Sequence, residues 1–88
     1  MKIKKVIYTS DFLKSIKKIS PKTASLINKR ERIFLSNCFD KRLKTHKLKG
    51  KLESYWSFSI TYSHRILFRF IGENKVLFLI YGTHRIYK

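Results

Sequence analysis

The feature that most constrains this fold is a two-residue alternation in the second half of the sequence. Polar side chains in residues 55–62 alternate with large apolar ones: Trp56, Phe58 and Ile60. Because successive side chains of a β-strand point to opposite faces, this period of two predicts a strand with one buried face. A similar alternation follows in residues 65–71, so the two runs predict a β-hairpin.

Two further runs have the composition of strands. Residues 76–81 are almost wholly apolar, as is typical of a central strand, and a turn at Gly72-Glu73-Asn74 separates them from the hairpin. Residues 2–8 alternate and contain β-branched and aromatic side chains, which predicts a short first strand.

Between the first strand and the hairpin, apolar residues recur at the spacing of an α-helix. Ser10 and Asp11 suit a helix start, and the helix that follows is expected to bury one face, listed as Phe12, Leu13, Ile16, Ile19. Ser20-Pro21 ends this helix and starts a second one that runs to about Phe39. Residues 28–32 form the polar side of the second helix, and the short link predicts a helix hairpin.

These elements predict one α+β domain over residues 1–88 with the order β-α-α-β-β-β. An N-terminal strand and the helix hairpin should precede an antiparallel sheet of about three further strands, and the helices should cover the aromatic face of that sheet. The opposite face should then present Ser57, Ser59, Arg65 and Arg69, with the basic loop of residues 40–51 at its rim.

Charge is the strongest global signal, since 21 Lys and Arg residues oppose 5 acidic residues and give a formal net charge of +16. Such a chain should attract polyanions, with nucleic acid first, an acidic protein second and an anionic membrane third. No apolar stretch approaches the length of a membrane span and no signal peptide is evident, so we expect a cytoplasmic protein without a membrane partner. The single Cys38 lies in a helical run and is expected to be a buried thiol.

The candidate chemical groups are histidine, arginine, lysine and serine on a basic surface. No glycine-rich phosphate loop, carboxylate pair or metal-ligand cluster is recognisable, so neither a metal nor another cofactor is expected. The set suits metal-free RNA cleavage, in which one group takes the 2′-OH proton, a second stabilises the phosphate and a third protonates the leaving oxygen. His46, Arg65 and His84 are the candidates, with His64 in the turn as a weaker one.

Other residues could hold RNA beside these groups. The cations of the loop and the strand are Lys47, Lys49, Lys51 and Arg69, and Tyr87 could stack on a base. A solvated loop remains the alternative for the lysines, and packing within the sheet remains the alternative for an aromatic residue.

The runs HKLKGKLESYWSFSITYSHRILFRF and VLFLIYGTHRIYK resemble the RelE/ParE superfamily of toxins from type II toxin–antitoxin systems, within it the RelE, YoeB and YafQ branches. The resemblance implies a RelE/ParE-like fold and a ribosome-dependent mRNA endonuclease, with the ribosome, mRNA and a cognate antitoxin as partners. It matches His46 to the loop histidine of YafQ-like members and Arg65 to the strand arginine of YoeB-like members. His84 matches the C-terminal histidine of both branches, and Tyr87 stands near their C-terminal tyrosine.

The resemblance also shows departures, because Ser59 and Ser63 stand where YafQ-like members carry a second histidine and an aspartate. The leading hypothesis is a toxin that cuts mRNA with His46 as base, Arg65 as phosphate stabiliser and His84 as acid. One alternative is a ParE-like inhibitor that binds DNA gyrase without a catalytic site. A second is a non-catalytic basic RNA-binding module.

Overall fold

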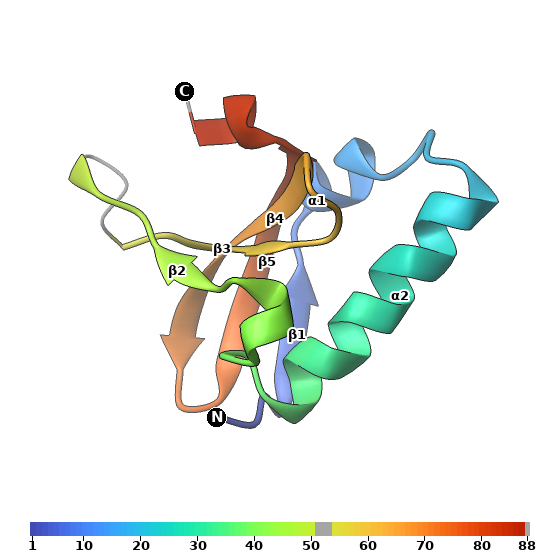
Figure 1. Cartoon of the computed structure of the whole chain (residues 1–88). Helices are drawn as coiled ribbons and strands as arrows, with labels where there is room; N and C mark the ends of the chain where they lie inside the picture. The colour runs from blue at the N-terminus through green and yellow to red at the C-terminus, as the bar shows by residue number, and fades with distance from the viewer. Residues whose placement is uncertain (51–53, 88) are drawn as a thin grey trace.

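The computed structural model describes residues 1–50 and 54–87, which form a sheet with helices packed on one side (Figure 1). Its strands are β1 (Lys5–Tyr8), β2 (His46–Lys47), β3 (Trp56–Ser59), β4 (His64–Gly72) and β5 (Lys75–Thr83). Its helices are α1 (Ser10–Ser15), α2 (Pro21–Ser36) and the short 3-10 helices η1 (Lys41–Leu43) and η3 (His84–Tyr87).

The five described strands form one sheet in the order β1-β5-β4-β3-β2. The predicted hairpin is confirmed by antiparallel pairing of β3 with β4, and β4 pairs antiparallel with β5. The antiparallel arrangement expected of the later strands is confirmed, and β1 joins them parallel to β5, a direction that the sequence pattern did not specify. The chain reaches β5 only after the helices and the hairpin, so it can place β1 at the far edge of the sheet in either direction.

The loop expected over residues 40–51 contains structure that the sequence did not indicate. Residues 41–43 form η1, and His46 and Lys47 form β2, which pairs antiparallel with β3. Because β2 has only two residues and neither is apolar, it has no alternation of its own to reveal it.

Both helices begin close to the predicted positions and end earlier. Thr9, rather than Ser10, caps α1, because its hydroxyl accepts the Phe12 N–H at 3.1 Å. Helix α1 stops at Ser15, and Leu13, which was expected on its buried face, is 52% exposed. The helix ends because Ile16 leaves the helical conformation, with φ −105° and ψ 2°.

Helix α2 has the predicted start and a nearer end. The Ser20 hydroxyl accepts the Thr23 N–H at 3.1 Å, and Pro21 occupies the first turn, where a missing N–H costs nothing. The helix ends at Ser36 rather than near Phe39, because Asn37 takes an extended conformation. Phe39 instead packs against Trp56 and Phe70 at the end of the sheet.

The core lies between α2 and the sheet, and Phe34 is at its centre. Its ring is fully buried and stacks on Phe58 with ring centroids 4.5 Å apart. The edges of Phe68 and Phe78 meet the same ring at 5.0 and 5.5 Å. The predicted aromatic face therefore packs on α2, as the alternation of β3 and β4 required. Cys38 is also fully buried, and burial raises the pKa of its thiol.

The side of the sheet that neither α1 nor α2 covers, called here the helix-free face, is less open than predicted. Ser57 was expected to be displayed there, but it is fully buried. Its partner in β4, Leu67, is also buried, so this buried pair closes the middle of the face. Ser59, Arg65 and Arg69 keep at least partial exposure. No helix in the described part of the chain is long and apolar enough to cross a membrane.

Candidate functional site

Arg65 lies in a row of paired residues across the helix-free face. It pairs with Ser59 of β3 on one side and with Gly82 of β5 on the other. Paired residues of antiparallel strands present their side chains to the same face. Arg65 is therefore flanked by a short hydroxyl side chain and by a residue with no side chain, and it is itself only partly exposed.

Gly82 lets the chain after β5 fold back over Arg65's row. A β-carbon at Gly82 would lie 2.5 Å from Ile86 Cγ2, so the glycine is required for Ile86 of η3 to pack there. The backbone of His84, at the start of η3, follows directly on Thr83, which pairs with His64 at the start of β4. The side chains of His84 and Tyr87 lie outside what the structure describes.

His46 stands on β2 in the neighbouring row of the same face. It pairs with Ser57, which pairs with Leu67 of β4. Ordinary strand and row spacings place the backbones of His46 and Arg65 roughly 12 Å apart. A nucleotide and an arginine side chain between them can span this gap.

A hydrogen bond defines the protonation pattern of the His46 ring. Nδ1 lies 3.0 Å from the backbone oxygen of Lys44. Because a carbonyl oxygen can only accept, Nδ1 must carry the proton, and in the neutral ring Nε2 is then the proton acceptor. Lys44 itself has a left-handed backbone with φ 52°, which turns the chain from η1 into β2.

The other predicted RNA-binding residues are spread over both faces. Lys47 pairs with Trp56 and so lies on the opposite side of β2 from His46. Arg69 belongs to the helix-free face, where its guanidinium is 5.8 Å from the Tyr55 ring centroid. Lys49 is exposed beside the buried Leu48. Lys51 lies outside the described residues.

His64 belongs to a different environment from Arg65, although the two are adjacent. Its ring stacks on Tyr81 with centroids 5.4 Å apart, and its Nδ1 is 3.0 Å from the Ser63 hydroxyl. Tyr81 packs against the helix-side core, and burial raises the pKa of its phenol. The structure thus brings His46, Arg65 and the His84 backbone toward one face and leaves His64 on the other.

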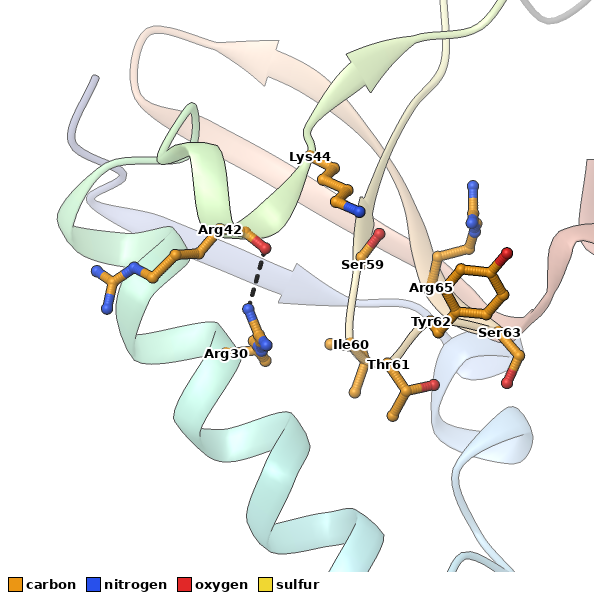
Figure 2. A pocket seen from close by; sticks show the side chains of 9 residues that line it. All are labelled: Arg30, Arg42, Lys44, Ser59, Ile60, Thr61, Tyr62, Ser63 and Arg65. Atoms are coloured by element: carbon orange, nitrogen blue, oxygen red, sulfur yellow. Dashed lines mark hydrogen bonds between the residues drawn. The ribbon is translucent and has the colours of Figure 1, made fainter.

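A cavity of about 710 Å³ opens beside Ser59 and Arg65, and no pattern in the sequence indicates it. One wall contains Arg30 of α2 with Arg42 and Lys44, and the other contains Ser59, Tyr62 and Arg65 (Figure 2). We call it the basic cavity, because no carboxylate belongs to its wall among the described residues. Its parts are distant in sequence, and Arg30 was assigned only to the polar side of a helix.

Acidic side chains near the basic cavity hold structural bonds. Asp40 forms a two-pronged ion pair with Arg42, with 3.0 Å to Nε and 2.9 Å to Nη2. These hydrogen bonds lower the pKa of Asp40 to about 2. In Figure 2 the Arg42 guanidinium points away from the cavity, whereas the Lys44 amine points toward Ser59. Arg30, Lys44 and Arg65 therefore supply its positive charge.

Comparison with known proteins gives a likeness of fold. No family model matches the sequence, and no curated protein matches it. Among solved structures, a YoeB/ParE toxin from Agrobacterium tumefaciens is similar with a TM-score of 0.77 and 24% identity, over 92% of this chain and 99% of that chain.

Two toxin–antitoxin complexes are similar as well. The DinJ–YafQ complex of E. coli contains a chain with a TM-score of 0.74 at 14% identity, covering 98% of this chain and 97% of that chain. The YoeB–YefM complex of Staphylococcus aureus gives a TM-score of 0.72 at 19% identity, covering 96% and 99%. The α+β, RelE/ParE-like fold expected from the resemblance is confirmed.

Proposed function

We propose that this chain, which has the fold of the RelE, YoeB and YafQ toxins, is the toxin of a type II toxin–antitoxin system. In this proposal it cuts mRNA on the ribosome without a metal and so inhibits translation. The observation that carries the proposal is the shared face: Arg65 lies between Ser59 and Gly82, the chain to His84 folds back beside it, and His46 stands in the next row.

The reaction needs a base, an anion-stabilising group and an acid. His46 Nε2 takes the proton of a ribose 2′-OH, and the 2′-oxygen attacks the adjacent phosphorus. The Arg65 guanidinium stabilises the charge that grows on the phosphate oxygens. The bond from phosphorus to the 5′-oxygen breaks, and His84 gives that oxygen a proton, which leaves a 2′,3′-cyclic phosphate and a 5′-hydroxyl.

RNA binding in this proposal follows the basic surface. Lys49, Lys51 and Arg69 hold the backbone near the site, and Tyr87 stacks on a base. Lys47 has the same role at the edge of β2, on the side away from His46. DNA lacks the 2′-OH, so the same groups would leave DNA uncut.

The proposed partners are the ribosome, mRNA and a cognate antitoxin. Two of the similar structures are toxin–antitoxin complexes, which supports an antitoxin partner for this chain. A net charge of +16 favours both an acidic antitoxin segment and RNA. All of these partners are found in the cytoplasm, where we propose that the chain acts.

The test is cell-free translation with the chain added and the mRNA ends mapped. We expect translation to stop and new ends to appear within codons, with cyclic phosphate on the upstream fragment. His46→Ala and His84→Ala should each abolish cutting. His64→Ala is the matched control, since it removes a histidine from the other face and should keep cutting once circular dichroism shows a folded chain.

Two outcomes would contradict the proposal. Continued translation with no new mRNA ends would remove the nuclease function, and a supercoiling assay on the same protein would then show whether gyrase is inhibited. Full cutting by both His46→Ala and His84→Ala would leave the nuclease function and remove this mechanism.

A further inference from the structure

The basic cavity contains a binding arrangement that the proposed reaction does not use. Its cations Arg30 and Lys44 stand on the wall opposite Tyr62, whose side chain is 96% exposed. We propose that this cavity is a subsite for one nucleotide of single-stranded RNA, with the base stacked on Tyr62 and the phosphate held by Arg30 and Lys44. The inference rests on the proposed function, because Arg65 belongs to the same cavity and would hold the neighbouring, scissile phosphate.

Tyr62 is a presented ring rather than a side chain that failed to pack. It lies in the β3–β4 turn, which is closed by hydrogen bonds from the Ile60 and Thr61 N–H groups to the His64 oxygen, at 2.9 and 3.2 Å. The His64 N–H in turn donates to the Thr61 hydroxyl at 3.1 Å. A closed turn fixes the backbone that carries the exposed ring, which lowers the entropic cost of stacking a base on it.

The Arg30 guanidinium is held in place and keeps donors available. Its Nη1 donates to the Arg42 backbone oxygen at 3.0 Å, which ties α2 to η1 (Figure 2). A guanidinium has five N–H donors, and this bond uses one of them. The remaining donors suit the paired oxygens of a phosphate.

Lys44 completes the phosphate site and connects it to His46, the proposed general base. Its left-handed backbone places the amine toward Ser59 and the carbonyl toward His46 Nδ1. Lys44 would therefore contact the bound nucleotide with its amine and hold the proposed proton-accepting ring of His46 with its carbonyl. A nucleotide in the cavity would in this way be positioned relative to His46. The volume of about 710 Å³ is in the range of pockets that enclose a small ligand such as a nucleotide.

An acidic protein segment could also meet these cations, but the observations favour RNA. A peptide carboxylate would use Arg30 and Lys44 and would leave the flat, exposed face of Tyr62 without a partner. A nucleotide satisfies all three residues, because every base has a face that stacks on an aromatic ring.

The experiment measures binding of a short 2′-O-methyl RNA, which cannot be cut because its 2′-oxygen has no proton to lose. Fluorescence anisotropy of the labelled oligonucleotide gives the affinity for the full chain. Tyr62→Leu should weaken binding roughly 5- to 150-fold, the range for loss of one stacked base, and Tyr62→Phe should stay within about twofold. Both variants change an exposed side chain, so the fold should persist.

A charge-matched pair tests the phosphate contact. Arg30→Gln should lower the slope of log affinity against log salt by about 0.7, the value for one phosphate of a single strand. Lys29→Gln removes the same charge from the exposed neighbouring position on α2 and should leave the slope unchanged.

Several results would overturn the subsite. These are no binding by the wild-type chain, wild-type affinity in Tyr62→Leu, or equal effects of Arg30→Gln and Lys29→Gln. Loss of affinity only for an acidic antitoxin peptide would assign the cavity to the protein partner instead. The oligonucleotide cannot be cut, so its binding is measured independently of cleavage. Oligonucleotide binding by a chain that does not cleave mRNA would contradict the proposed nuclease and keep the subsite. Wild-type mRNA cleavage by Tyr62→Leu would contradict the subsite and keep the nuclease.

Discussion

Replacing Gly82 by alanine tests how η3 is held against the sheet. The added β-carbon would lie 2.5 Å from Ile86 Cγ2, whereas carbon atoms in good contact are about 3.5–4.0 Å apart. Cγ2 is attached directly to the β-carbon of a stiff, branched side chain, so rotating a distant bond does not move it away. Ile86 and the backbone that carries it must therefore move outward by at least about 1 Å.

The loss of stability in Gly82→Ala depends on whether η3 stays packed on the sheet or detaches from it. If η3 stayed in place, the overpacking would cost about 1–3 kcal/mol. If η3 detached, the loss would be the burial of one partly exposed isoleucine, about 1 kcal/mol. Detachment costs less, so we expect the free energy of unfolding to fall by about 1 kcal/mol. In the proposed mechanism, detachment of η3 would misplace His84 by more than the roughly 1 Å that can cost about 100-fold in rate, so the proposed mRNA cutting should fall by at least that order.

Three measurements check Gly82→Ala. Urea denaturation gives the change in free energy, hydrogen exchange at the Arg85 and Ile86 amides reports on η3, and cell-free translation reports on cutting. Adding Ile86→Ala to the same chain removes Cγ2 and should restore part of the cutting. Wild-type exchange at both amides together with wild-type cutting in Gly82→Ala would refute the packing argument.

Two predictions concern stability. Phe34→Ala removes a fully buried ring and should lower the free energy of unfolding, measured in urea, by about 3–5 kcal/mol. Leu13→Ala is the control at a half-exposed position and should lower it far less. Equal losses in the two variants would contradict the core described above. The folded pKa of Asp40, about 2, is below its unfolded value of about 3.9, so its ion pair with Arg42 stabilises fully above pH 4 and this contribution is lost as the pH falls through 2. Asp40→Asn should therefore be less stable than wild type at neutral pH, and the difference should shrink steadily as the pH falls from about 4 through 2; a difference that stays constant over that range would exclude this linkage.

The strands that carry their own period could be predicted from the sequence. Phe58, Ile66 and Phe68 are fully buried as the alternation required, because a strand with one buried face must place every second side chain in the core. Strand β2 could not be predicted, since pairing with β3 is what makes its two polar residues a strand. The parallel direction of β1 is also absent from its own pattern, because alternation fixes faces and not direction.

The residues of the candidate site could be named from the sequence, but their arrangement in space could not. The candidate groups were identified by residue type and by a family resemblance, and the structure brings His46 and Arg65 to one face through register. Arg30 and Tyr62 were not candidates, since each has an ordinary explanation in its local sequence. They form one cavity only because α2 packs beside the β3–β4 turn.

The parallel pair of β1 and β5 has a consequence for how the chain is made. Val6 pairs with Val76, so the first strand waits for nearly the whole chain before it has a partner. Contacts of such long sequence separation form late and slow the folding of small domains. During synthesis from the N-terminus, a partly made chain would hold α1 and α2 without a complete sheet beneath them. A nascent chain would thus lack the assembled face until β5 has left the ribosome, which delays any toxicity toward the ribosome that is making it.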